Sequence, residues 1–213
     1  MTHPKILLRQ ASATIFAALL PCLGGHAQER CQAFNLETLP KREVRAVWLT
    51  TLSNLDWPKG YATTQEGIER QKRQLTEILD RYAEANINTV LFQARVRATT
   101  TYPSALEPWD RCLTGQEGRA PGYDPLRFAI EECHKRGMEI HAWLATIPCG
   151  PWTSLGCRRL RAKGLRLRKL DGAGYLDPSD ERVAPYLASV CAELTEKYDI
   201  DGIHLDYKSI DRK

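Results

Sequence analysis

Residues 198–207 read YDIDGIHLDY, and this stretch decides the fold prediction. An apolar run begins at Gly202, and within it His204 and Asp206 stand two residues apart. Successive side chains of a β-strand point to opposite faces, so His204 and Asp206 would share one face. A strand that ends in polar groups on one face is typical of a βα-barrel, whose functional side chains gather at the C-terminal strand ends. A hairpin strand with a solvated aspartate is the alternative.

Three earlier segments also have the β-branched and aromatic composition of strands. Helical periodicity separates them. A capping box at Thr63-x-x-Glu66 begins the first helix, and Asp124-Pro125 and Asp177-Pro178-Ser179 begin the two later ones. Pro185 would cost a hydrogen bond inside a helix, so we expect the regular part of the last helix to begin only near it. The order β-α-β-α-β-α-β predicts parallel strands joined by helical crossovers. The expected strands are residues 43–51, 89–95, 138–146 and 202–206.

Polar and aromatic residues mark the ends of these strands and the loops that follow them. Gln93 and Arg95 share one face of the second strand, and His141 and Trp143 share one face of the third. A hydrogen-bonded core histidine is the alternative for His141. Trp57, in the loop after the first strand, is either a packed lid over the core or a platform for a sugar ring.

Two connections between the expected elements are long or strongly charged. Residues 96–123 contain three prolines and three glycines, and loops of this length are typically functional or mobile. Residues 158–169 carry seven basic side chains, while the net charge of the whole chain is only +4. We expect this basic segment to be a solvated loop or helix face, with contact to an anionic glycan as the alternative.

The N-terminus has the order of a secretory signal peptide. Lys5 and Arg9 precede the apolar residues 11–20, and Gly25-His26-Ala27 favours cleavage after Ala27. The apolar run is too short to span a membrane. We therefore expect residues 1–27 to be a signal peptide, 28–42 a lead-in segment and 43–213 the folded domain. The protein would be exported to the periplasm or cell envelope, with lipid attachment at Cys22 as the alternative.

Six cysteines follow the expected cleavage site, which permits disulfides in an exported chain. Cys149 and Cys157 flank one loop and are the preferred pair. The sequence contains no dinucleotide, nucleotide, serine-esterase or zinc-protease motif, and no C-x-x-C pair. We therefore expect no metal and no cofactor. With this mild charge and no binding motif, nucleic acid is not expected as a partner.

Four separated motifs resemble the glycosyl-hydrolase-like family 10 proteins (the DUF187 group) over about residues 41–207. They read EVRAVWLTTLSNLDWPK, FQARVRATTTYPSALEPWDRCLTG, YDPLRFAIEECHKRGMEIHAWLAT, and YLDPSD with YDIDGIHLDY. The resemblance implies an α/β fold of the TIM type, a (β/α)8 barrel of which this chain holds about the first four β/α units. It also implies a glycoside hydrolase that acts on envelope or other polysaccharide strands, including peptidoglycan strands without stem peptides.

The resemblance further implies the site residues. From its place at the C-terminal end of a strand, we expect Asp206 to be the general acid. His204 would hold it by a hydrogen bond, with a purely structural role as the alternative for His204. The family commonly has Asn-Pro where this chain has Ala145-Thr146, so one polar contact of the family is missing. The implied substrate-binding residues are Arg45, Trp48, Asp56, Trp57, Gln93, Arg95, His141, Trp143 and Tyr207.

Glycoside hydrolases typically use two carboxylates, about 5–5.5 Å apart for retention or about 6.5–9.5 Å apart for inversion. Asp56 is one candidate for the second, and strands five to eight of a full barrel are the other source. We expect a truncated barrel with weak or no activity by itself and with outer strands prone to self-association. A non-catalytic carbohydrate-binding protein, or an inactive remnant, is the alternative. A metal-dependent hydrolase is more distant, because no ligand spacing demands a metal.

Overall fold

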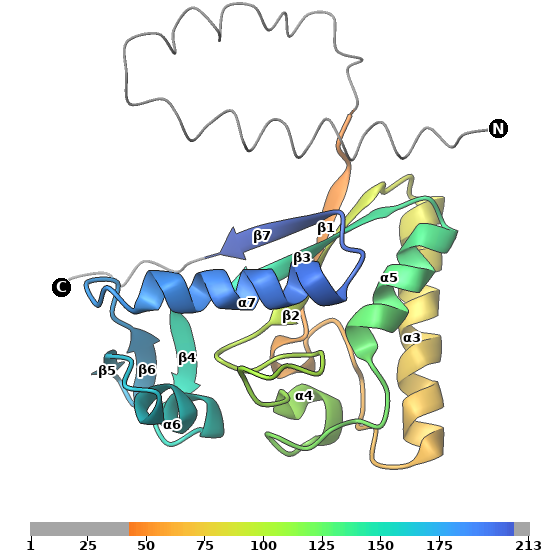
Figure 1. The fold of residues 1–213 in the computed structure, drawn as a ribbon. Coiled ribbons are helices and arrows are strands. Elements are labelled where there is room, and N and C mark those ends of the chain that lie inside the picture. Colours follow the sequence, from red (N-terminus) through yellow and green to blue (C-terminus); the bar gives the residue numbers. More distant parts are fainter. Residues whose placement is uncertain (1–42, 207–213) are drawn as a thin grey trace, which may run out of the picture. The chain divides into compact units, whose positions relative to one another are not determined.

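The computed structural model describes residues 43–206, shown in colour in Figure 1. The expected signal peptide, the lead-in segment and Tyr207 lie outside these residues. Four parallel strands form one sheet in the order β1-β2-β3-β7. The strands are β1 (Ala46–Leu49), β2 (Thr89–Arg95), β3 (Glu139–Ala145) and β7 (Gly202–Asp206). The predicted α/β fold is confirmed: the chain forms part of a TIM-type barrel.

Three long helices connect these strands: α3 (Gln65–Glu84), α5 (Pro125–Lys135) and α7 (Val183–Lys197). Figure 1 shows α3 and α5 side by side. The predicted start of α5 is confirmed, since Asp124 accepts a hydrogen bond from the amide of Arg127 at 3.1 Å and Pro125 follows it. The predicted cap of α3 is wrong by one residue. Thr64 caps this helix by accepting from Gly67 at 3.2 Å.

Asp177 does not begin the last helix, but the expected later start near Pro185 is confirmed. The carboxylate of Asp177 pairs instead with Arg166 and Arg168, each at 3.0 Å. The helix begins at Val183, so that Pro185 lies in its first turn. Proline is tolerated there because the amide groups of the first turn have no partner within the helix.

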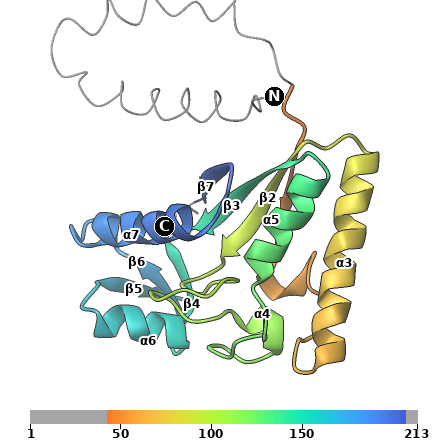
Figure 2. The ribbon, with the colours of Figure 1, turned by 45° about the vertical axis from the view of Figure 1, so that its right-hand side comes forward.

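Residues 148–176 form a small subdomain (Figure 2). Within it most basic side chains of residues 158–169 are exposed, so the expected solvated face is confirmed, but a helix and a strand carry it as well as a loop. Strands β4 (Pro148–Pro151), β5 (Leu167–Leu170) and β6 (Ala173–Leu176) make an antiparallel sheet in the order β4-β6-β5, with α6 (Leu155–Ala162) beside it. The turn between β5 and β6 is Asp171-Gly172, whose φ angles are 47° and 77°. Two adjacent positive φ angles are what a two-residue hairpin turn requires, and Asp-Gly supplies them readily.

The long connection after β2 is packed into the molecule. Thr100, Thr101 and Tyr102 are fully buried, and the connection contains the short helix α4 (Arg111–Thr114). Glu193 of α7 holds the connection by accepting hydrogen bonds from the hydroxyl of Ser104 at 2.5 Å and from the amide of Ala105 at 2.7 Å. Of the two expectations for this connection, its burial argues against mobility and leaves a functional role open.

One hydrophobic core lies between the sheet and its helices. Alternate residues of the strands face these helices, as the two-residue period requires. No helix within residues 43–206 is long and apolar enough to cross a membrane. The strand residues of the core include Val90, Phe92, Ile140, Ala142 and Leu144, and its helix residues include Leu75, Leu79, Leu126, Ile130, Val190 and Leu194.

A buried ion pair joins the sheet to the long connection. Arg95, the last residue of β2, makes two parallel hydrogen bonds to Glu107, from Nε at 2.8 Å and from Nη2 at 2.7 Å. Its remaining nitrogen, Nη1, donates to the carbonyls of Ala145 and Thr146 at the end of β3. The hydroxyl of Tyr186 in α7 donates to Glu107 at 2.9 Å. One guanidinium therefore ties two strand ends, the connection and a helix together.

Replacing Glu107 with glutamine keeps the shape of this side chain but removes the negative charge beside Arg95. We expect the free energy of unfolding to fall by about 3–5 kcal/mol, because the guanidinium stays buried without its counter-charge. Unfolding in urea measures this change. Tyr186→Phe is the control, since it removes one hydrogen bond to the carboxylate and should cost about 1.5–3 kcal/mol. Equal losses in the two variants would contradict a dominant role of the ion pair.

The preferred cysteine pair is not bonded in the structure, where Cys149 and Cys157 are both free and buried. The two are nevertheless neighbours, because the thiol of Cys157 lies 3.2 Å from the carbonyl oxygen of Cys149. The neighbouring Cys149 thiol stabilises the thiolate of Cys157 and lowers the pKa of Cys157 to about 7. Their pairing stays a prediction.

We expect refolding in a glutathione redox buffer to join Cys149 to Cys157, with oxidised glutathione accepting the two electrons. The reason is that the native fold already holds the two thiols together and gives Cys157 thiolate character near neutral pH. Peptide mapping without reductant would detect the linked peptides. In Cys157→Ser, Cys149 should instead react with an alkylating reagent. Full alkylation of both cysteines in the refolded wild type would rule the pair out.

Candidate functional site

The predicted polar residues share the sheet face that points away from the helices. In the strand register Gln93 lies opposite Trp143, Trp143 lies opposite His204, and Ala145 lies opposite Asp206. Most neighbours of these residues along the strands, such as Phe92, Ala142 and Leu144, face the hydrophobic core, whereas Leu205 is 57% exposed. The expectation that His204 and Asp206 share one face is therefore confirmed. We call this side of the sheet the concave face.

A contact between the two outer strands shows that the sheet curls. Trp48 of β1 and His204 of β7 stack edge to face, with ring centroids 5.9 Å apart and an interplanar angle of 69°. Three interstrand spacings of about 4.8 Å would hold these rings roughly 14 Å apart on a flat sheet. The curvature of a barrel brings the two rings together. Trp48 nevertheless remains 53% exposed.

Asp206 is held by Trp143 rather than by His204. The indole N–H of Trp143 donates to Oδ2 of Asp206 at 3.1 Å. The predicted hydrogen bond from His204 is absent because residues two apart on a strand are separated by about 7 Å, and the His204 ring turns to Trp48. Thr146, which stands at the family's Asn-Pro position, donates to the carbonyl of Asp206 from its amide at 2.8 Å and its hydroxyl at 2.9 Å.

Gln93 fixes the chain that leaves β1. Its Oε1 accepts hydrogen bonds from the hydroxyl of Thr50 at 2.6 Å and from the amides of Thr51 and Leu52 at 2.9 and 3.0 Å. These donors determine which way the carboxamide points. Its Nε2 has no partner within residues 43–206, although no buried side-chain nitrogen there lacks one. Nε2 therefore keeps its donors, although Gln93 as a whole is only 3% exposed.

Two predicted substrate-binding residues are structural instead. Arg95 is fully buried; burial lowers its pKa, but the facing carboxylate of Glu107 outweighs this and the net pKa is raised. Trp57 is also fully buried, and its indole N–H donates to the carbonyl of Gln71 at 2.8 Å. Its ring packs against Phe92, with centroids 5.9 Å apart. Neither side chain reaches a substrate, so the packed-lid alternative is correct for Trp57.

Two other predicted residues lie near the N-terminal strand ends. Arg45 precedes β1, and its Nε donates to the carbonyl of Asn86 in the turn before β2. His141 is near the start of β3, where its Nε2 lies 3.6 Å from a carboxylate oxygen of Glu139. A Cβ on Gly202 would lie 2.8 Å from Nδ1 of His141, so the ring covers this glycine. The structure does not bring Arg45 or His141 to the carboxylate of Asp206.

Asp56 lies just beyond the C-terminal end of β1. Its Oδ2 accepts a hydrogen bond from the amide of Thr50 at 2.9 Å. It is partly exposed. Among the predicted residues, the structure thus places Asp56, Gln93, Trp143, His204 and Asp206 toward the C-terminal ends of the strands, with Trp48 beneath them.

A cavity of about 590 Å³ opens at the C-terminal ends of β1, β2 and β3. We call it the mouth cleft. The segments that follow these three strands form its walls. Sequence reasoning did not select its charged residues, because they follow the strands rather than end them. Its polar lining includes Asn54, Arg97, Asp110, Arg111, Glu117 and Ser154.

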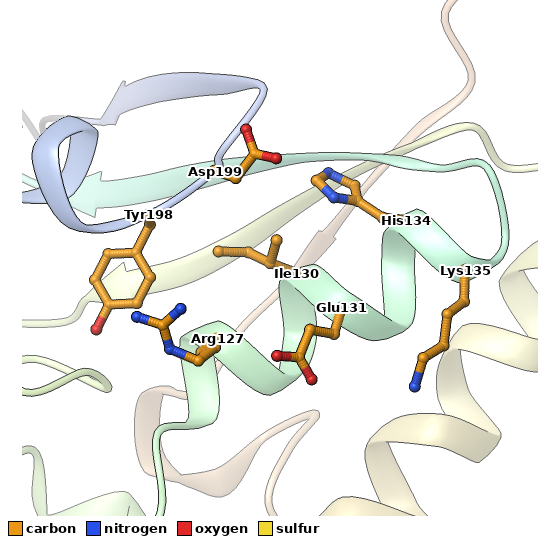
Figure 3. Close-up of a pocket in the computed structure, with 7 residues that line it drawn as sticks. All are labelled: Arg127, Ile130, Glu131, His134, Lys135, Tyr198 and Asp199. Carbon is orange, nitrogen blue, oxygen red and sulfur yellow. The ribbon is translucent and has the colours of Figure 1, made fainter. Parts of the chain in front are cut away.

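A second cavity, of about 350 Å³, lies along α5 and the segment before β7 (Figure 3). Its lining includes His134 and Lys135, which precede β3, and Tyr198 and Asp199, which precede β7. It therefore lies toward the N-terminal strand ends, away from Asp206. Within residues 43–206 no cluster of three or more His, Cys, Asp or Glu side chains has the arrangement of a metal site.

Comparison with solved structures supports the fold. The noncanonic maltogenic alpha-amylase AmyB from Thermotoga neapolitana matches with a TM-score of 0.51. The match covers 79% of this chain and 40% of the amylase, at 13% sequence identity. At this identity the similarity shows the shared fold alone.

Sequence relatives identify the family. Glycosyl hydrolase DigH of Escherichia coli K12 is 32% identical over 180 residues, which cover 76% of this chain and 41% of DigH. Glycosyl hydrolase YngK of Bacillus subtilis 168 is 33% identical over 181 residues, covering 78% of this chain and 33% of YngK. The chain thus spans less than half the length of these relatives. Residues 43–211 match the family model Glycosyl hydrolase-like 10, and the chain belongs to that family.

Proposed function

We propose that this chain carries the general-acid part of a glycoside hydrolase that acts on glycan strands of the cell envelope, such as peptidoglycan strands without stem peptides. The observation that carries the proposal is the position of Asp206. It ends β7 on the concave face, where the N–H of Trp143 holds one carboxylate oxygen. Family membership and the C-terminal location of active sites in βα-barrels support it. The envelope assignment rests on the signal-peptide pattern of residues 1–27.

The surrounding side chains suit a sugar chain. The exposed ring of Trp48 offers an apolar face of the kind that pyranose rings stack on, and His204 braces its position. Nε2 of Gln93 can donate to a sugar hydroxyl. Trp143 engages only Oδ2 of Asp206, so Oδ1 is left to deliver a proton to the glycosidic oxygen.

Within residues 43–206, Asp56 is the best candidate for the second catalytic carboxylate. The other acidic residues near this edge have their oxygens engaged. Glu107 binds Arg95, Asp110 accepts from the Thr99 hydroxyl, and Glu117 accepts from the amides of Leu155 and Gly156. Asp56 accepts only from the amide of Thr50 and lies beyond the end of β1, at the other edge of the four-stranded sheet from β7.

Carbohydrate binding without cleavage is the second candidate function. It is favoured by one observation: Asp206 is the one carboxylate at the C-terminal end of the concave face of the four described strands. Trp48, Gln93 and Trp143 would bind a glycan without an acid pair. The outer strands β1 and β7 each have one unpaired edge in this part of the chain, and self-association through them stays a prediction.

Asp206→Asn tests the proposal, because asparagine can still accept the hydrogen bond from Trp143 but cannot act as an acid. We expect release of glycan fragments from denuded peptidoglycan to fall at least about 100-fold, the usual contribution of a general acid. Binding to the same strands should persist.

Asp171→Asn is the matched control, since Asp171 is an exposed turn residue whose positive φ asparagine tolerates. Its activity should equal that of the wild type. Unchanged hydrolysis in Asp206→Asn would overturn the assignment of Asp206. Binding without any cleavage, even by the wild type, would support the second candidate.

A further inference from the structure

The mouth cleft contains two arginines that the fold does not use. Arg97 follows β2, and Arg111 is the first residue of α4; both line the cleft and both are exposed. Neither guanidinium has a hydrogen bond or ion pair within residues 43–206. Each of these two guanidinium groups therefore keeps all five N–H donors for a ligand. Arg95, two residues before Arg97, instead uses its donors in hydrogen bonds inside the molecule.

The acidic residues of the cleft do not compete for these donors. Asp110 is 8% exposed and accepts hydrogen bonds from the Thr99 hydroxyl at 2.5 Å and the Cys112 amide at 2.7 Å. Glu117 accepts at 2.9 Å from each of two amides at the beginning of α6. Both carboxylates are thus satisfied by neutral donors, while the two guanidinium groups still lack an anion.

The backbone around the arginines is built to hold them in place. Gly150 has a φ of 82°, and a Cβ there would lie 3.5 Å from Cβ of Arg97, so the stem of Arg97 packs along the backbone of β4. On the opposite wall, Nδ2 of Asn54 donates to the carbonyls of Pro58 at 2.7 Å and Cys112 at 2.8 Å. This fixes the segment after β1 against α4, which carries Arg111.

We propose that the mouth cleft binds a sugar unit that carries a free carboxylate, with Arg97 and Arg111 as its ligands. The inference rests on the proposed function, since it places an acidic sugar of the glycan strand beside the C-terminal strand ends. A guanidinium fits a carboxylate through two parallel hydrogen bonds. The cavity volume of about 590 Å³ lies within the range of small-ligand sites. Arg97 and Arg111 would thus bind the substrate in place of Arg95, which the resemblance implied for that role.

The test compares two substrates that differ only in this group: denuded peptidoglycan strands, whose muramic acid carboxylates are free, and the same strands after chemical reduction of those carboxylates to alcohols. Binding by the full chain is measured calorimetrically. The variants are Arg97→Gln and Arg111→Gln, and Arg158→Gln is the control. Arg158 is an exposed arginine of α6 that does not line the cleft.

We expect each cleft variant to bind the carboxylate-bearing strands about ten- to a hundredfold more weakly, the usual worth of hydrogen bonds to a charged group. Its binding to reduced strands should equal that of the wild type, and Arg158→Gln should match the wild type on both. An unchanged thermal midpoint verifies folding.

Equal binding of both strands by the wild type, or unchanged binding by the cleft variants, would overturn the inference. In that case, loss of hydrolysis in Asp206→Asn would still support the proposed function. Failure of the wild type to bind either strand would overturn both.

Discussion

The hydrogen-bonded ion pair between Arg95 and Glu107 is the constraint on which this structure depends. Taking both charges out of water is costly, and the fold recovers that cost because every oxygen and nitrogen involved finds a partner. The guanidinium holds the carbonyls after β3, and Glu107 holds Tyr186 of α7. The strand ends that carry the candidate site are thereby fixed relative to the long connection, which also lines the mouth cleft.

Periodicity was sufficient to predict the parallel sheet and the shared face of its polar residues. The two-residue period is set by backbone geometry, so it places His204 and Asp206 on one side whatever the rest of the chain does. The bounds of β2 and β7 were predicted correctly for the same reason. Local capping chemistry likewise predicted the start of α5, because Asp124 and Pro125 act on their own helix.

What the sequence could not supply was the partner of each side chain. Arg95 was expected at the substrate because it ends a strand, yet its role depends on Glu107, twelve residues away in a connection without periodicity. Trp57 likewise depends on the carbonyl of Gln71. The hairpin after α6 was missed although Asp171-Gly172 is a strong turn signal, because the surrounding basic residues suggested a solvated loop.

Amide hydrogen exchange measured residue by residue tests most directly whether the ion pair organises the C-terminal edge. The amide of Thr146 donates to Asp206 at that edge, and the amide of Asp201 donates to Ile140 at the opposite end of the sheet. In Glu107→Gln we predict that exchange at Thr146 accelerates more than exchange at Asp201. Equal acceleration of the two amides, or protection at Thr146 that stays as high as in the wild type, would contradict the account.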